Sequence, residues 1–398
     1  MMMAVTIGLI GVASAMAQEE TLEQFQKVVT EYQNRYQSAM RSGKHNEAIE
    51  PLKAVITLMD TTTLYKTTMI PASAFREQKG MYLYDLACCF ALTGRKRQAL
   101  DALTESVDCG YKQYDNMLND NDLVSLRTDK RYQALLARVK ERRPLNVLKQ
   151  SGSYGNDGLQ VEFRYQPKES NNLRLVREYF NLDSVAGQGD ELSQIINLLH
   201  FAHDNIRHDG GNRALAEMDA IDIYNSYKAT GRGVNCRQLA ITLCEMYLSL
   251  GMPARYVTCL PADPNDYECH VICTVWSSQL QKWLYIDPTM DAWVTDENGV
   301  MLSIAEVRER LINDRPLELC ATANWNHENR QTKEQYLEEY MAKNLYYFIC
   351  KKLNRFNAES FYRNSDPADE IGLIPMGYVN DGIKCATTTD SATFWAKP

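Results

Sequence analysis

The sequence predicts an α+β protein in which a helical N-terminal region precedes a domain built from helices and an antiparallel sheet. Glycine and proline are scarce between about residues 20 and 145, and apolar residues recur there with a helical period. A turn-rich segment, SGSYGNDG at 151–158, then interrupts the pattern and indicates a domain boundary. After this boundary, helical segments come before three strand-like segments at 254–260, 269–276 and 282–286, an order typical of α+β domains.

The first residues resemble an export signal. The stretch from Met3 to Ala15 is uncharged and mostly apolar, and the small residues Ala15 and Ala17 fit a cleavage site before a polar segment. This run is too short to span a membrane, and no later stretch is long and apolar enough to do so. No lysine or arginine precedes the run, so an apolar first helix is the alternative. We expect a signal peptide over 1–17 and a periplasmic or secreted protein.

The helical region contains two groups of residues with the same spacing, the second 51 positions after the first: Tyr36, Ala39, Gly43, Ala48 and Leu52, then Ala87, Phe90, Gly94, Ala99 and Leu103. In each group a glycine suits a turn between two helices, and the alanines allow the helices to approach closely. These positions resemble the tetratricopeptide repeat consensus, with an extra helix expected over 62–75. The resemblance implies a tetratricopeptide-like domain over 18–150. We expect this domain to act as a helical support, and binding of a peptide or protein partner is the alternative.

Composition limits the classes of partner. The net charge is -8, and the chain has no run of lysine and arginine suited to neutralising phosphates, which argues against a nucleic-acid partner. Hydrophobic residues make up 45% of the chain, which is enough for an ordinary apolar core. Eleven cysteines is an odd number, so an exported form would keep at least one free thiol or an intermolecular disulfide.

The segment GRGVNCRQLAITLCEMYLSLGMPARYV, residues 231–257, places a cysteine at the start of a predicted helix. Apolar residues follow at helical intervals, and Gly251 followed by Pro253 indicates where the helix ends. Cys236 therefore lies in the first helical turn, where unpaired backbone N–H groups and the helix dipole favour an anion. Such an environment favours a reactive thiolate. A buried structural cysteine is the alternative.

A thiol nucleophile needs a base, and the base needs a group that orients it. His270 lies within the strand-like segment 269–276, and Asp287 ends the next strand because Pro288 prevents its continuation. Two adjacent antiparallel strands would place both side chains close together. Taken singly, each residue also fits an ordinary role as a core histidine or a turn aspartate.

In this order, the three residues resemble the motifs of the transglutaminase-like superfamily, a branch of the papain-like cysteine hydrolase fold. The chain has GVNC at 233–236 and LGMPARYV at 250–257, with the strand residue His270 next. A third motif, Trp283 to Thr289, ends a strand with Asp-Pro-Thr. The resemblance covers roughly residues 172–289. It implies a core in which the helix that carries the nucleophile packs on an antiparallel sheet.

This resemblance implies a cysteine peptidase, amidase or acyltransferase domain over 151–398, including a C-terminal extension. Cys236 would attack an amide carbonyl of a peptide or protein substrate, His270 would transfer the proton, and Asp287 would fix the imidazole. Release of the thioester by water, which we favour, gives hydrolysis, whereas release by an amine gives crosslinking. A noncatalytic peptide- or protein-binding module with the same fold is the alternative.

The residue that stabilises the oxyanion is a separate question. Papain-like enzymes often carry a glutamine for this purpose a few residues before the cysteine, and residues 228–230 contain none. Asn235 and Gln238 are therefore the oxyanion candidates, and a donor from elsewhere in the chain is the alternative.

Histidines before the cysteine raise the question of a metal. His200, His203 and His208 lie within residues 191–208, which are predicted to form one helix, so two of these histidines would share a face. The sequence places no supporting third ligand near them. We therefore expect no metal and no cofactor.

Overall fold

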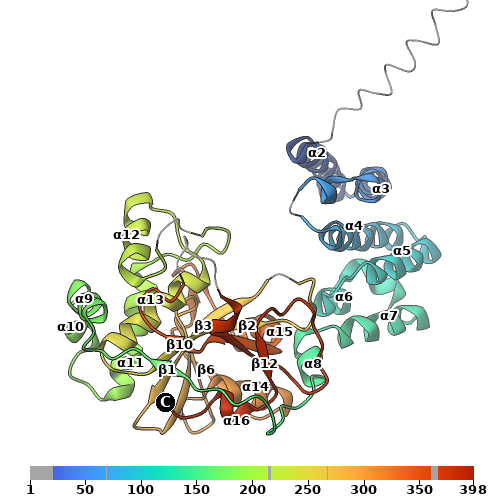
Figure 1. Ribbon diagram of the computed structural model, residues 1–398. Coiled ribbons are helices and arrows are strands. Elements are labelled where there is room, and N and C mark those ends of the chain that lie inside the picture. Colours follow the sequence, from blue (N-terminus) through green and yellow to red (C-terminus); the bar gives the residue numbers. More distant parts are fainter. Residues whose placement is uncertain (1–20, 69, 214–216, 267, 360–365) are drawn as a thin grey trace, which may run out of the picture. The chain divides into compact units, whose positions relative to one another are not determined.

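The computed structural model (Figure 1) describes residues 21–68, 70–213, 217–266, 268–359 and 366–398. The signal peptide predicted over 1–17 lies outside these residues. The chain forms two compact units, Met1–Arg143 and Pro144–Pro398, which are considered separately below. Among the helices in the described ranges, none is both long and apolar enough to cross a membrane.

The first unit is helical. Its α-helices are α2 (Leu22–Arg41), α3 (His45–Thr61), α4 (Ala72–Leu92), α5 (Lys96–Asp108), α6 (Tyr114–Asn119) and α7 (Lys130–Glu141), and its 3₁₀ turns are η1 (Leu64–Lys66) and η2 (Asn121–Leu126). From α2 to α5, each helix packs against the next one. A shared core of apolar side chains fills the space between them.

The spacing shared by the two groups of residues corresponds to two helical hairpins. Ala48 and Ala99 are completely buried where the helices approach each other. Gly43 and Gly94 form the turns with φ values of +67° and +76°, a region that glycine enters without steric cost. The predicted pattern of small residues and turns is thus present in the structure.

The extra helix expected over 62–75 is not formed. The chain instead makes the short turn η1 at Leu64–Lys66, and α4 begins only at Ala72, after Pro71. Proline has no backbone N–H and disfavours a helical conformation in the preceding residue. Pro71 is the N-cap residue directly before α4 and so marks where this helix starts.

The second unit contains an eight-stranded sheet with the order β12-β11-β9-β2-β3-β4-β5-β6. The strands are β2 (Ala254–Leu260), β3 (His270–Ser277), β4 (Lys282–Asp287), β5 (Ala292–Thr295), β6 (Glu318–Leu319), β9 (Tyr347–Lys351), β11 (Glu370–Leu373) and β12 (Ala386–Thr388). All neighbours pair antiparallel except β11 and β12, which are parallel. The α+β class and the antiparallel sheet are confirmed.

Helices and short elements surround this sheet. The helices are α8 (Pro144–Lys149), α9 (Asn171–Tyr179), α10 (Leu182–Ala186), α11 (Glu191–Asn205), α12 (Ala220–Thr230), α13 (Cys236–Ser249), α14 (Ile304–Ile312), the π-helix η3 (Glu334–Met341), α15 (Ala342–Asn344), the 3₁₀ turn η4 (Pro367–Asp369) and α16 (Ser391–Phe394). Two further strand pairs are β1 (Arg164–Tyr165) with β10 (Leu353–Asn354), and β7 (Asn324–Trp325) with β8 (Asn329–Arg330).

The central helix α13 is buried on all sides. It packs against β2 and β3, as Figure 1 shows, and also against α9, α11 and α12. Every residue from Gln238 to Ser249 is buried, which is typical of a helix that is not confined to the surface. The residue at the start of α13 is therefore held by a rigid support.

Both faces of the central strands are buried. On β3, Val271 and Cys273 pack in the core that includes α13, whereas Ile272 packs in a second core on the opposite face. Tyr285 of β4 lies in that second core together with Tyr336 of η3. This two-sided burial explains why the strands contain nearly continuous apolar residues.

The first unit ends before the turn-rich segment at 151–158. Helix α8 packs against α14, η3 and α15 of the second unit, and its Leu148 is completely buried in the core there. The change of unit therefore falls after Arg143. Pro144 begins α8 and marks this point in the sequence.

Candidate active site

Cys236 is the first residue of α13, as the sequence predicted. The preceding Asn235 is the N-cap, and its side-chain oxygen accepts a hydrogen bond of 3.0 Å from the Gln238 backbone N–H. Just before it, Gly233 lies so close to another segment that a Cβ atom would be 2.8 Å from the Arg207 carbonyl oxygen. A glycine at 233 thus allows the loop that carries Cys236 to approach residues 207–209.

His270 and Asp287 lie next to each other on adjacent strands. His270 begins β3, Asp287 ends β4, and His270 Nε2 is 2.7 Å from Asp287 Oδ2. Both side chains are almost completely buried, with exposed fractions of 1% and 0%. A hydrogen bond in such an environment is strong because water does not compete for it.

The Asp287 carboxylate has further donors that fix it in place. The Tyr336 hydroxyl donates to Oδ2 at 2.6 Å, and the Thr289 backbone N–H donates to Oδ1 at 2.8 Å. Burial raises the pKa of Asp287, but the charge of His270 and these hydrogen bonds outweigh burial and lower it below its usual value. Asp287 is therefore a carboxylate at neutral pH.

His270 and Cys236 lie close enough to affect each other's ionisation. The Nε2 atom of His270 is bonded to Asp287, its buried Nδ1 has no hydrogen-bond partner among the described residues, and the nearby Cys236 thiol contributes to the raised pKa of the ring. Burial lowers the pKa of His270, but the Asp287 charge, Tyr340 and hydrogen bonds raise it well above 6.5. Tyr340 contacts this ring edge-on, with centroids 5.2 Å apart.

The thiol itself is strongly acidic. Burial raises the pKa of Cys236, but hydrogen bonding to His208 and to His270, together with the charge of His270, lowers it to about 5. By contrast, burial raises the pKa of Cys259, Cys269 and Cys273. At neutral pH the geometry thus supports a Cys236 thiolate beside a His270 imidazolium, the form that reacts with carbonyl carbons.

The two oxyanion candidates proposed from the sequence have other partners. The Asn235 side chain caps α13. The Gln238 side chain is completely buried, and its Nε2 lies 3.8 Å from the Met218 sulfur. These contacts give neither amide a defined place at a carbonyl bound to Cys236, and the oxyanion role of the two residues stays a prediction.

The three histidines that the sequence placed on one helix separate in the structure. Helix α11 ends at Asn205, because Ile206 adopts an extended conformation, so His208 lies outside it. His200 Nδ1 is 2.6 Å from Asp291 Oδ1, and His208 reaches Cys236. Sequence reasoning missed this contact because it treated His208 as part of a helix.

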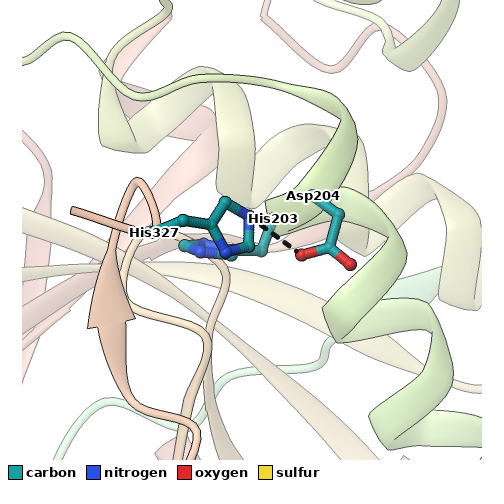
Figure 2. A group of neighbouring side chains, drawn as sticks. All are labelled: His203, Asp204 and His327. Atoms are coloured by element: carbon teal, nitrogen blue, oxygen red, sulfur yellow. Dashed lines mark ion pairs between the residues drawn. The ribbon is translucent and has the colours of Figure 1, made fainter. Parts of the chain in front are cut away.

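Figure 2 shows the third histidine, His203, beside Asp204 and His327. His327 Nε2 is 3.2 Å from Asp204 Oδ1, and these residue types are suitable ligands for a transition metal. However, both ring nitrogens of His203 already lie near protein oxygens: Nδ1 is 3.0 Å from Pro288 O, and Nε2 is 3.1 Å from Asn324 Oδ1. The contacts of His203 with Asn324 and of Asp204 with His327 join α11 to the β7–β8 hairpin.

All eleven cysteines are free thiols in the structure. Cys273 lies buried on the α13 side of β3, on the strand face opposite His270, as the alternation of strand side chains predicts. It packs in the same core as Cys244 of α13.

Comparison with known proteins supports the family suggested by the motifs. Residues 179–288 match the model of the transglutaminase-like superfamily, and Cys236, His270 and Asp287 all lie within this match. The second unit thus contains a transglutaminase-like domain, and it supports a cysteine-dependent enzyme of that superfamily.

Two individual proteins are similar over parts of the chain. A chloroplastic protein of Arabidopsis thaliana is 27% identical over 101 residues, which are 25% of this chain and 26% of that protein. The chain thus spans about a quarter of the length of this curated relative. A solved structure from Cytophaga hutchinsonii, described as a "Putative Cysteine Protease", is 20% identical, with a TM-score of 0.24, over 35% of this chain and 44% of that one. With so low a TM-score, nothing about activity follows from the second similarity.

Proposed function

We propose that the protein is a thiol-dependent acyl-transfer enzyme that hydrolyses a peptide or amide bond through a thioester on Cys236. The observation that carries this proposal is the Cys236–His270–Asp287 arrangement, in which the thiol pKa is lowered to about 5 and the imidazole pKa is raised. A thiolate and an imidazolium are thus paired before substrate arrives. Such opposite shifts in adjacent groups are typical of catalytic sites.

The first half-reaction uses both members of this pair. The Cys236 thiolate forms a bond to the carbonyl carbon of the substrate, and the carbonyl π electron pair moves to oxygen. When this oxyanion collapses, the C=O bond reforms and the C–N bond breaks, while the nitrogen takes the proton from His270 Nδ1. An amine leaves, and the acyl group remains on sulfur as a thioester.

The second half-reaction returns the enzyme to its starting state. His270, now neutral, removes a proton from water, whose oxygen attacks the thioester carbonyl. Collapse of the second oxyanion breaks the C–S bond and releases a carboxylic acid, and the Cys236 thiolate is again paired with protonated His270. If an amine attacks in place of water, the product is a crosslink, and this transglutaminase reaction is the alternative.

A noncatalytic binding module is the competing proposal of a different class. Burying two charges costs free energy, so a buried charge pair is expected where a function requires it. A surface that only recognises peptides has no such requirement. Asp287 alone accepts hydrogen bonds from His270, Tyr336 and Thr289. These three hydrogen bonds fix the carboxylate that orients the His270 imidazole, which favours the enzyme proposal over the binding module.

The helical unit and the location of the protein extend the proposal. In the tetratricopeptide-like interpretation, the first unit binds a peptide or protein partner. A groove of about 610 Å³ supports this idea, and the polar and charged side chains along it include Glu31 and Arg35 of α2 and Glu47 of α3. From the apolar segment at 1–17 we further propose that the protein is exported to the periplasm or secreted.

The experiment that tests the proposed function is alkylation of Cys236 against pH, resolved by peptide mass spectrometry in the wild-type protein and in His270→Ala. We expect half-maximal labelling near pH 5 in the wild-type protein and a shift toward the ordinary thiol value in the variant. Incubation with p-nitrophenyl acetate should in addition add an acetyl group to Cys236. Labelling that rises only above about pH 8 in both proteins, without acetylation, would contradict the proposal.

A further inference from the structure

His208 lies beside the loop that carries Cys236, where it helps to lower the pKa of the thiol, and the backbone holds it there. The Val234 N–H donates to the Arg207 carbonyl at 2.9 Å, and the Asp209 N–H donates to the Val234 carbonyl at 2.7 Å. These two bonds form a short parallel bridge between His208 and Val234, two residues before Cys236. The position of His208 is therefore tied to the loop that carries the thiol.

The β7–β8 hairpin holds His208 from its other side. The Asn326 side chain accepts a hydrogen bond of 2.8 Å from the His208 backbone N–H and donates one of 2.9 Å to the His208 carbonyl. One amide thus satisfies both backbone groups of this residue. The preceding hairpin residue, Trp325, donates its indole N–H to His208 Nδ1 at 2.9 Å.

The indole contact determines which ring nitrogen carries the proton. Tryptophan Nε1 only donates hydrogen bonds, so His208 Nδ1 must accept, and the ring proton lies on Nε2. A second proton on Nδ1 would point at the indole proton. Since Nδ1 is occupied by Trp325, Nε2 is the nitrogen that faces Cys236, as a neutral N–H donor.

Two imidazoles with different chemistry therefore lie beside the same sulfur. His270 presents Nδ1, backed by the Asp287 carboxylate, and exchanges a proton during the reaction. His208 presents Nε2–H, because its Nδ1 accepts the hydrogen bond from the Trp325 indole. His208 is thus placed to donate a hydrogen bond from Nε2.

We propose that His208 Nε2–H stabilises the oxyanion that forms on the substrate carbonyl when Cys236 attacks, and that Trp325 is the positioning residue that fixes the required tautomer. This inference rests on the acyl-transfer function proposed above. The carbonyl oxygen gains an electron pair and no proton, so a donor that keeps its hydrogen is what the step requires. The backbone N–H of Cys236, in the first turn of α13, supplies a second donor.

The experiment compares two reactions of Cys236 in the same protein. Acetylation by p-nitrophenyl acetate passes through a tetrahedral oxyanion, whereas displacement of iodide from iodoacetamide does not. Both rates are measured at pH 9, where the thiol is ionised, on the wild-type protein, His208→Ala, His208→Gln and Trp325→Phe. The matched control is His200→Ala, since His200 hydrogen-bonds to Asp291 and not to Cys236.

We expect His208→Ala to lower the acetylation rate by about 10²- to 10³-fold, the range for loss of one oxyanion donor, and to change alkylation only a few-fold. His208→Gln, which keeps an N–H donor, should recover part of the acetylation rate. Trp325→Phe should lower acetylation less than His208→Ala does. In [¹⁵N]histidine NMR spectra, it should also shift the His208 signals from the pure Nε2–H tautomer toward a mixture, which a purely structural role would not do.

The outcomes separate the two proposals. If the wild-type protein acetylates Cys236 and His208→Ala does so equally fast, the oxyanion role is wrong and the enzyme proposal stands. If the wild-type protein forms no acetyl-Cys236, both proposals are overturned. If His208→Ala loses acetylation and alkylation equally, the thiol itself is impaired and the oxyanion role is rejected. The two rates of His208→Gln show whether the fold is intact in a variant at this position.

Discussion

The Tyr336 hydroxyl donates a 2.6 Å hydrogen bond to Asp287 Oδ2, the same oxygen that lies 2.7 Å from His270 Nε2. Tyr336 comes from η3, 49 residues beyond Asp287, and is completely buried. Its hydroxyl is in turn 2.6 Å from that of Tyr285. A chain of hydrogen bonds therefore leads from the core to the imidazole beside Cys236.

This chain predicts the effect of Tyr336→Phe. The substitution leaves a buried carboxylate with one donor fewer, so the pKa of Asp287 should rise and the protein should lose about 1–3 kcal/mol of stability. A less anionic Asp287 supports the imidazolium less well, so the alkylation profile of Cys236 should move to higher pH. Chemical denaturation and pH-dependent alkylation measure the two effects. Tyr285 contacts Tyr336 and not Asp287, so Tyr285→Phe should change the stability and the alkylation profile less than Tyr336→Phe does. A larger change in Tyr285→Phe would contradict this order of hydrogen bonds.

The pKa shifts also fix the shape of the pH–rate profile. Acyl transfer should increase as pH rises through about 5, where Cys236 ionises, because only the thiolate attacks. It should decrease again as pH rises through the pKa of His270, which lies well above 6.5, because the leaving group then receives no proton. Steady-state hydrolysis of p-nitrophenyl esters and of anilides between pH 4 and 10 tests whether the rate rises and falls at these two pKa values.

Loss of the imidazolium should move the acidic side of that profile. In His270→Ala the thiol keeps its burial but loses the nearby charge, so half-maximal alkylation should shift upward by several pH units. An acidic side that stays near pH 5 in this variant would show that the ionising group is not Cys236. The anilide substrate is informative at high pH, because an amine leaving group needs the His270 proton more than a nitrophenolate does.

The sequence predicted the parts of the site that depend on local pattern. Cys236 was placed at the start of a helix because Gly251 and Pro253 marked the helix end, and α13 spans Cys236–Ser249. Asp287 was placed at the end of a strand because Pro288 follows it, and β4 ends there. Capping and proline effects act over a few residues, so they can be recognised without knowledge of the fold.

The residues that were missed come from distant parts of the chain. Trp325 reaches His208 across 117 positions, and no local pattern indicates such a pairing. Tyr336 and Tyr340 did carry a signal, since they are four positions apart and a helix places such residues on one face. The helix predicted over 191–208 ends at Asn205. Because of this small difference in length, His208 lies outside α11 and beside the loop that carries Cys236.

Two glycines of one loop give a matched pair of stability predictions. In Gly233→Ala, the new Cβ would lie 2.8 Å from the Arg207 carbonyl oxygen and 2.9 Å from the His208 carbonyl carbon, so the two segments must separate. We expect a loss of about 1–3 kcal/mol, as for other overpacked sites, and slower acetylation of Cys236. In Gly231→Ala nothing lies within 4 Å, and only the left-handed φ of +67° opposes the side chain. That control should lose about 1 kcal/mol and acetylate normally.

Substitutions of Asn235 separate helix capping from the charge near the thiol. Asn235→Ala removes the acceptor for the Gln238 N–H and should cost about 0.5–2 kcal/mol, with little change in the ionisation of Cys236. Asn235→Asp keeps the cap but places a negative charge next to the thiolate, so stability should be retained while half-maximal alkylation moves to higher pH. Thermal unfolding and pH-dependent alkylation distinguish the two. If Asn235→Asp alkylates at the same pH as the wild-type protein, the N-terminal turn of α13 does not govern the thiolate, and its stabilisation must come from His270 and His208 alone.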